Sequence, residues 1–240
     1  MCAPVPALPP PHVTPAPLHA FAPGVSASFA ALPPRPVARD CRTTPRPAVA
    51  APRGSSLLLH ATPGGPVVRR LVTRTEFGSE LRLPVVRRRG PWLGVLSSTL
   101  PDGHVGWVRQ SRSVRIIRRV RVHVLVDRSR GRLVVLAAGR VVRRVPVGVG
   151  AAASPTPTGR FAITDKLDGS AFSPAAYGCC ILALSGHQHD LPAGWRGGDR
   201  LAIHGGPAGA SSAGCLHATE RDLRWLMRRL PTGTLVTIRA

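Results

Sequence analysis

The sequence predicts a mainly β protein, in which a small β-barrel precedes a second β-rich domain with one or two helices. Strand-length apolar runs separated by Gly and Pro occupy residues 53–117. Further strands flank a turn at Gly139, and a helical apolar repeat follows Thr219. The chain has 240 residues, 43% of them hydrophobic, which suffices for two modest cores.

Residues 1–52 are predicted to be a disordered, proline-rich leader or linker. Segments such as P-A-L-P-P-P-H and T-P-R-P recur there, and Asp40 is the only acidic residue. Proline fixes the backbone angle φ and removes a hydrogen-bond donor, so such a stretch does not readily extend a helix or sheet. We therefore assign it no regular structure.

Residues 53–117 are predicted to form short strands joined by turns. Leu57–Leu59 precede a Pro-Gly-Gly-Pro turn, and Trp92 and Trp107 lie in the later runs Gly-Pro-Trp-Leu-Gly-Val and Gly-Trp-Val. With the intervening Phe-Gly, this order resembles a bacterial SH3-like module. The resemblance implies a groove that binds wall components or peptides, whereas the physical role of aromatics favours burial of the two rings. Both interpretations stay open.

Residues 118–240 are predicted to form the second domain. The runs that end and begin around Gly139 form a β-hairpin, and His123 falls inside an apolar strand, where we interpret it as structural. Strands are expected at residues 120–126, 132–136, 141–147, 160–164, 177–184, 201–203 and 234–238.

A helix is predicted after Thr219. This threonine can cap it, with Asp222 three residues on in a position like that of a capping box. Pro231 ends the helix. We expect the helix to support the loop that precedes it. Its apolar positions recur at i, i+3, i+4 and i+7: Leu223, Leu226, Met227 and Leu230.

The stretch 203–217 carries the candidate chemistry. His204 precedes Cys215 by eleven residues, and Gly, Ala and Ser fill nearly all of the interval. A thiol needs a base to act as a nucleophile near neutral pH, and an imidazole within hydrogen-bond reach supplies one. Gly214 permits a sharp turn, so the N–H groups of Gly214 and Cys215 could face a developing oxyanion.

The residues His204-Gly205 and the later Ser-Ala-Gly-Cys-Leu-His run resemble the motif of the L,D-transpeptidase (YkuD-like) catalytic domain. In that motif His-Gly is followed by Ser-x-Gly-Cys-x-Arg or a close variant. A second segment, Thr-Pro-Thr-Gly-Arg-Phe at 156–161, resembles the family's segment before a strand beside the active site. Two motifs in the right order make the resemblance specific, and it covers about residues 118–240.

The resemblance implies the roles of the site residues. Cys215 is the nucleophile, His204 the base, and Gly205 orients the imidazole through its carbonyl. Ser212 steadies the loop or the substrate, and Gly214 supports the oxyanion. The donor is a peptidoglycan tetrapeptide stem, cut between meso-diaminopimelate and D-alanine, and the product is a 3→3 cross-link or, with water, a carboxypeptidase product. No cofactor or metal is implied.

Two positions depart from the family pattern. Ala213 stands where many members have histidine or another polar residue, and His217 stands where they often have arginine or asparagine. His217 either replaces that residue in contacting the substrate or is structural, because imidazole is the weaker cation. These departures leave open a second hypothesis, a catalytically degenerate wall-binding protein.

The cysteines are Cys2, Cys41, Cys179, Cys180 and Cys215. Their odd number leaves at least one thiol unpaired within the chain, as a catalytic thiol requires. The absence of C-x-x-C argues against a structural zinc site. The adjacent Cys179 and Cys180 are poorly placed for a disulfide with each other, and we expect small buried strand residues.

The run His187-Gln188-His189 is a weak candidate for a metal site. An H-x-H pair without an accompanying pattern of carboxylates is a weak signal. We therefore interpret these three residues as an exposed polar loop.

The net charge of +22 comes from 33 basic residues, of which only Lys166 is lysine. Such arginine use is typical of a GC-rich genome, and it also favours attraction to anionic wall polymers. A basic nucleic-acid binder is a third hypothesis, but no nucleic-acid motif is present and only 4% of residues are aromatic. We expect a monomer without specific nucleic-acid binding.

The expected location is outside the cytoplasm, at the cell wall or in the periplasm. No run reaches the ~18 apolar residues of a membrane-spanning helix. The first residues lack the basic region and unbroken apolar stretch of a secretory signal. Either an export signal lies upstream of Met1, or export follows a route that the sequence does not reveal.

Overall fold

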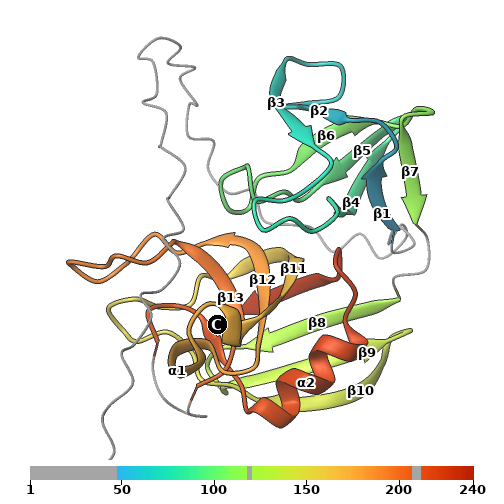
Figure 1. Ribbon diagram of the computed structural model, residues 1–240. Coiled ribbons are helices and arrows are strands. Elements are labelled where there is room, and N and C mark those ends of the chain that lie inside the picture. Colours follow the sequence, from blue (N-terminus) through green and yellow to red (C-terminus); the bar gives the residue numbers. More distant parts are fainter. Residues whose placement is uncertain (1–47, 118–120, 207–211) are drawn as a thin grey trace, which may run out of the picture. The chain divides into compact units, whose positions relative to one another are not determined.

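The computed structural model describes residues 48–117, 121–206 and 212–240, which form two β-sheets and two short helices (Figure 1). The first sheet is antiparallel, with seven strands in the order β3-β2-β6-β5-β4-β1-β7. The second is a curled mixed sheet of eight strands in the order β10-β9-β8-β15-β11-β12-β13-β14. The predicted mainly β fold is thus confirmed. Within the described ranges, no helix has the length and apolar character needed to cross a membrane.

The first sheet buries its own core, which includes Leu59, Leu93 and Val95. Of the two tryptophans predicted on strands, Trp107 is buried and Trp92 is half-buried against the ring of His60, 4.9 Å away. The strands are β1 (Ala48–Pro52), β2 (Ser56–His60), β3 (Val67–Val72), β4 (Leu83–Arg89), β5 (Trp92–Val95), β6 (Gly106–Arg109) and β7 (Val114–Ile117).

The predicted leader is wrong over its last five residues, because Ala48–Pro52 form strand β1. Val49 pairs with Pro84 of β4 on one side and with Ile117 of β7 on the other. Alanine and valine side chains are small enough to be buried between two neighbours, and Pro52 closes the strand where no further ladder bond is needed. The proline-rich composition of the segment does not predict this strand. Residues 1–47 of the predicted leader lie outside the described ranges.

The second sheet is antiparallel except at two pairs. β8 runs parallel to β15, and β13 runs parallel to β14. Its strands are β8 (Val122–Asp127), β9 (Arg132–Ala137), β10 (Arg140–Pro146), β11 (Gly159–Asp168), β12 (Cys180–His187), β13 (Arg200–His204), β14 (Leu216–His217) and β15 (Leu235–Arg239). A 3-10 turn, η1 (Gly169–Ala171), and helix α1 (Pro174–Tyr177) connect β11 to β12.

The predicted hairpin is confirmed in β9 and β10. Its two-residue turn places Ala138 at φ +49° and Gly139 at φ +80°, which matches the twist of the flanking strands. His123 lies on the neighbouring β8 as predicted, with its Nε2 atom 2.9 Å from the Thr237 hydroxyl. Burial and the nearby Arg160 guanidinium lower the pKa of His123, so it stays neutral at pH 7.

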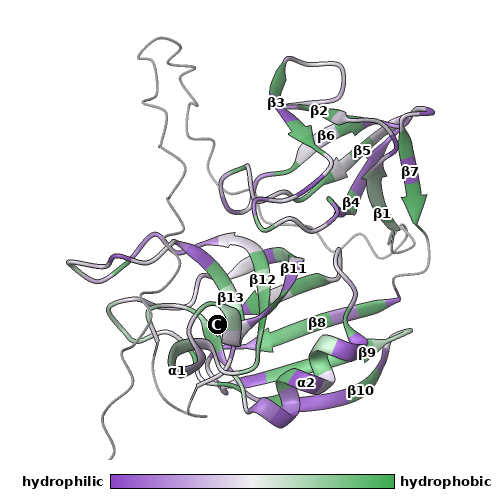
Figure 2. Ribbon diagram, viewed as in Figure 1, coloured by the Kyte–Doolittle hydropathy of each residue, from purple (hydrophilic) through white to green (hydrophobic). Residues whose placement is uncertain are grey.

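Helix α2 (Glu220–Arg229) begins and ends as predicted. The Thr219 hydroxyl accepts a 3.3 Å bond from the Asp222 N–H, and Leu226 accepts from the Leu230 N–H. Its apolar stripe faces the core of the second sheet, and the opposite face is charged (Figure 2). Leu223, Leu226 and Leu230 are fully buried. Burial of these three leucine side chains contributes several kcal/mol to the stability of the fold. It therefore holds in place the segment that follows the catalytic stretch.

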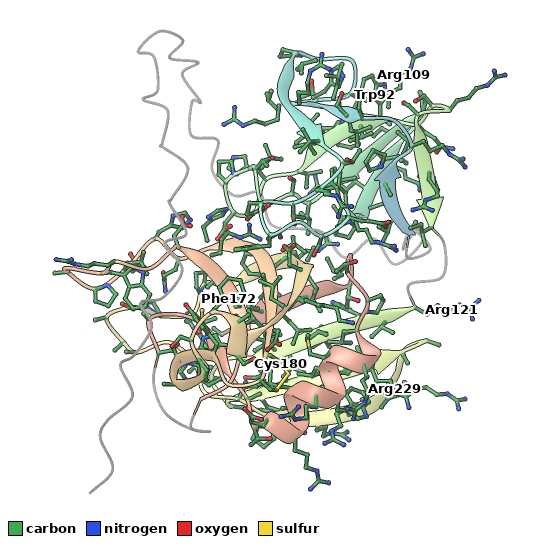
Figure 3. The ribbon with its side chains drawn as sticks, viewed as in Figure 1. Trp92, Arg109, Arg121, Phe172, Cys180 and Arg229 are labelled. Atoms are coloured by element: carbon green, nitrogen blue, oxygen red, sulfur yellow. A yellow bond between two sulfur atoms is a disulfide. The ribbon has the colours of Figure 1, made fainter. Side chains whose placement is uncertain are left out.

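The expectation for Cys179 and Cys180 is wrong, because the two residues are joined by a disulfide (Figure 3). They lie where the chain leaves α1 through Gly178, at φ +63°, and enters β12. The Cys179 N–H donates to the Glu220 carboxylate, which ties this corner to the start of α2. Among the cysteines in the described ranges, Cys215 is the free thiol.

Candidate active site

Strands β13 and β14 bring the two ends of the catalytic stretch side by side. Ile203 pairs with Leu216, and His204 pairs with His217. Side chains alternate between the faces of a sheet, so the residue that precedes β14, Cys215, shares a face with His217 and with His204 on the neighbouring strand. The sequence interval of eleven residues thereby becomes a local cluster of one thiol and two imidazoles.

The His204 ring is buried and held in one tautomer. Its Nδ1 atom lies 2.7 Å from the Gly205 carbonyl oxygen. Since a carbonyl can only accept, Nδ1 carries the hydrogen and Nε2 keeps its lone pair. The Tyr177 ring packs edge-on against the imidazole at 5.0 Å. The expected hydrogen bond to the Gly205 carbonyl is present. It leaves Nε2 of His204 unprotonated, as a general base requires.

Burial, helped by the neighbouring His217, lowers the pKa of His204 to about 4, although hydrogen bonds to the Gly205 and Ala176 backbone oppose the shift. The imidazole is therefore neutral at pH 7. Burial also raises the pKa of the Cys215 thiol, against the lowering effect of the Ala202 backbone. The resting pair is a neutral thiol and a neutral imidazole, so thiol deprotonation must accompany nucleophilic attack.

The turn at 212–215 is closed by the Ser212 side chain. Its hydroxyl donates to the Cys215 carbonyl at 2.6 Å and accepts from the Gly214 N–H at 3.0 Å. Ser212 therefore steadies the loop. The Gly214 N–H already has an acceptor, whereas within the described ranges the Cys215 N–H has none. An oxyanion at this turn would meet the Cys215 amide first.

A groove of 440 Å³ opens at this face. Cys215, His204 and His217 line its polar end. The rest of the lining is largely apolar, although Arg200 also contributes to it. The aromatic and aliphatic lining residues are Phe77, Phe172, Tyr177, Trp195, Leu167, Ile181 and Leu191. The Phe172 and Trp195 side chains are exposed at 56% and 46%, so the groove offers apolar surface next to the nucleophile.

His217 lies against His204, with ring centroids 4.7 Å apart. Burial lowers the pKa of His217, so it does not supply the positive charge of the arginine that many family members have here. Its Nδ1 atom is buried and has no hydrogen-bond partner within the described ranges. The charge that the resemblance implies at this position is absent.

The L,D-transpeptidase catalytic domain family, YkuD, matches residues 121–238. This region belongs to the L,D-transpeptidase family. Members of this family act on peptidoglycan stem peptides at the cell wall, outside the cytoplasm. The prediction of the family from its two motifs is confirmed.

Parts of several solved structures of L,D-transpeptidases match parts of this chain. One from Mycobacterium smegmatis is 17% identical, with 59% of this chain and 76% of that one covered and a TM-score of 0.38. L,D-transpeptidase 3 from Mycobacterium tuberculosis, in complex with a faropenem-derived adduct, is 15% identical, with coverages of 57% and 73% and a TM-score of 0.39. One from Xylanimonas cellulosilytica is 25% identical, with 49% and 60% covered and a TM-score of 0.34. No curated protein matches the chain.

Gln188 is the site residue that sequence reasoning missed. We expected an exposed loop for His187-Gln188-His189, but Gln188 is only 4% exposed and lines the groove of the L,D-transpeptidase domain. Its amide nitrogen lies 3.0–3.3 Å from the carbonyl oxygens of Ser154, Pro155 and Ala213. No local sequence pattern predicts these contacts, because the partners are 25 or more residues away in sequence.

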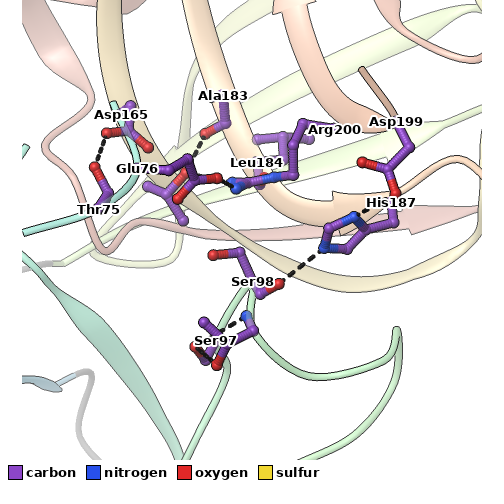
Figure 4. A network of polar contacts seen from close by, with 12 residues as sticks. Thr75, Glu76, Ser97, Ser98, Asp165, Ala183, Leu184, His187, Asp199 and Arg200 are labelled. Atoms are coloured by element: carbon purple, nitrogen blue, oxygen red, sulfur yellow. Dashed lines mark hydrogen bonds and ion pairs between the residues drawn. The ribbon is translucent and has the colours of Figure 1, made fainter. Parts of the chain in front are cut away.

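His187, the last residue of β12, and Arg200, the first of β13, take part in a polar network (Figure 4). Both ring nitrogens of His187 are engaged, with Asp199 at 3.0 Å and the Ser98 carbonyl at 2.8 Å, which does not suit a metal ligand. Within the described ranges no cluster of three metal-binding side chains occurs. Arg200 donates to the Leu184 carbonyl and pairs with Glu76. Burial lowers the pKa of Arg200 to about 10, which leaves it charged at pH 7.

Proposed function

We propose that this protein is an active L,D-transpeptidase that uses Cys215 as nucleophile and His204 as base. The observation that carries the proposal is the tautomer of His204. Its Nδ1–H is bound to the Gly205 carbonyl, so Nε2 is unprotonated, and the ring lines the same groove as the free thiol.

In the first half-reaction the Cys215 sulfur attacks the carbonyl carbon between meso-diaminopimelate and the terminal D-alanine of a tetrapeptide stem. The thiol proton passes to Nε2 of His204 as the C–S bond forms. The tetrahedral oxyanion accepts from the Cys215 N–H. The C–N bond then breaks, D-alanine leaves with the proton from the imidazolium, and a thioester remains on Cys215.

In the second half-reaction an acceptor amine attacks the thioester. His204 takes the proton of the amine, the C–S bond breaks, and the sulfur regains a proton. The new amide is a 3→3 cross-link, and water in place of the amine gives the carboxypeptidase product.

The test is incubation of the purified protein with a disaccharide-tetrapeptide, followed by mass analysis. The proposal predicts loss of D-alanine together with a cross-linked dimer. The matched control is Cys215→Ala, which leaves the groove intact and removes the sulfur. Equal product from both proteins would show that the reaction does not use this thiol.

The second candidate, a catalytically degenerate wall-binding protein, is favoured by two observations. Burial raises the pKa of the Cys215 thiol, and Ser212 occupies the Gly214 N–H. Under this alternative the protein binds stem peptides or anionic wall polymers without turnover. Wall binding that survives Cys215→Ala, with no product from the wild type, would favour it over the enzyme.

A further inference from the structure

The catalytic turn and the loop at 148–156 are joined along their backbones. Gly148 pairs with His217, Gly150 pairs with Ser212, and the Ala151 N–H donates to the Ser212 carbonyl at 2.9 Å. The Gly148–His217 pair ties one end of the 148–156 loop to β14, whereas the bonds to Ser212 join two loop segments to each other. A further contact fixes the joined loop segments, Ser154–Pro155 and Ala213, relative to the end of β12.

Gln188 makes that contact. It follows β12 directly, and its own N–H donates to the Asp199 carbonyl at 2.7 Å, just before β13. Its side-chain amide donates to Ser154 and Pro155 on one loop and to Ala213 on the catalytic turn. Its Oε1 atom accepts the Asp190 N–H at 2.9 Å, so both ends of the amide are engaged.

The geometry of Gly214 depends on the same side chain. Gly214 has φ +112°, and a Cβ atom there would overlap the Gln188 amide nitrogen. The Gln188 amide therefore lies directly against the Cα atom of the residue before Cys215. The Ala213 carbonyl that it binds belongs to the same peptide unit as the Gly214 N–H, so the bond sets the plane from which the Cys215 backbone continues.

We infer that Gln188 is a positioning residue for Cys215: it fixes the 213–215 backbone, and with it the direction of the Cys215 N–H that would face the oxyanion. The inference rests on the proposed function, since it assigns Gln188 to the same reaction. Gln188 touches no reacting atom. Misplacement of reacting groups by about 1 Å lowers a rate roughly 100-fold, which sets the scale of the expected effect.

The variants are Gln188→Leu, which removes the amide, and Gln188→Glu, which keeps the size and the acceptor but replaces the donor. Ser185→Ala is the matched control, because Ser185 is buried on β12, just before Gln188, and accepts a 3.0 Å bond from the Ala162 N–H. For each protein, two rates are measured by intact mass: acylation by a carbapenem and alkylation by iodoacetamide.

Both Gln188 variants should lose roughly 10- to 100-fold in acylation while alkylation changes little, because alkylation needs a thiol but no aligned oxyanion donor. Ser185→Ala should change neither rate. The inference is overturned if both Gln188 variants acylate like the wild type. It is also overturned if acylation and alkylation fall in parallel, as a loosened fold would require.

Hydrogen exchange of the same proteins separates this inference from the proposed function. Faster exchange confined to residues 149–156 and 212–217 in Gln188→Leu supports the positioning role, and unchanged exchange there contradicts it. If the wild type is not acylated at all, the proposed function is wrong, and the exchange result still decides whether Gln188 fixes the turn.

Discussion

The two ends of the eight-stranded sheet differ in how their strands are paired. At one end β9 and β10 are adjacent in sequence, joined by a two-residue turn, and aligned over six residue pairs. At the other end β13 and β14 pair over only two residues, and the turn before β14 depends on Ser212 and Gln188. The hairpin is stabilised by pairing between strands that are neighbours in sequence. The catalytic end is stabilised in addition by a side chain from a distant segment, Gln188.

This difference has a chemical consequence. Strand β9 of the hairpin buries alternate apolar side chains, Leu133 and Val135, on one face. The short parallel pair leaves room for a groove and places a thiol and two imidazoles on one face.

Replacement of the base should have the largest effect. His204→Gln removes the Nε2 acceptor, so carbapenem acylation of Cys215 should fall by about 10²- to 10⁴-fold. The control is His123→Gln, which changes a half-buried histidine, also with a lowered pKa, on β8 of the same sheet. Acylation should be unchanged there. Equal losses in the two variants would remove the distinction between a catalytic and a structural histidine.

The two turn glycines should respond differently to a methyl group. Gly214→Ala adds overlap with Gln188 to an unfavourable φ, and should cost roughly 2–5 kcal/mol of unfolding free energy. Gly139→Ala, where nothing lies within 4 Å, should cost only about 1–2 kcal/mol for its φ. Urea unfolding measures both. In a Gln188→Ala background the cost at 214 should shrink, and additive costs would contradict the contact.

The pH dependence follows from His204. Its pKa of about 4 lies below the ordinary 6.5, so the acid limb of acylation should fall near pH 4. The unfolded chain binds this proton between pH 6.5 and 4 and the folded chain does not, so stability should decrease as the pH falls through this window. This contribution is on the order of 3 kcal/mol. An acid limb near pH 6.5 would show that the imidazole is not buried.

The helix cap should have the smallest effect. Thr219→Ala removes the acceptor of the Asp222 N–H and should cost about 1 kcal/mol of unfolding free energy. Thr219→Ser keeps the hydroxyl and should cost less. Acylation should stay close to the wild-type rate in both, because Thr219 does not line the groove. A large loss of activity would place the start of α2 within the site.

Local patterns predicted most of the fold. Alternation around Gly139 gave the hairpin, and the capped apolar repeat from Thr219 gave α2, because both depend on neighbours in sequence. The paired motifs gave His204 and Cys215 as candidates. The sequence could not show β1, whose burial depends on β4 and β7, nor the role of Gln188, whose partners come from two distant loops. The disulfide between Cys179 and Cys180 was not predicted, because adjacent cysteines are usually poorly placed to bond to each other.

The central claim is that the sulfur of Cys215 is the nucleophile served by His204. Its most direct test is intact-mass analysis after incubation with a carbapenem, with the adduct located by peptide mapping. We predict one adduct, on Cys215, that is absent in Cys215→Ala and forms far more slowly in His204→Gln. An unmodified wild type, or an adduct that persists in Cys215→Ala, would contradict the account.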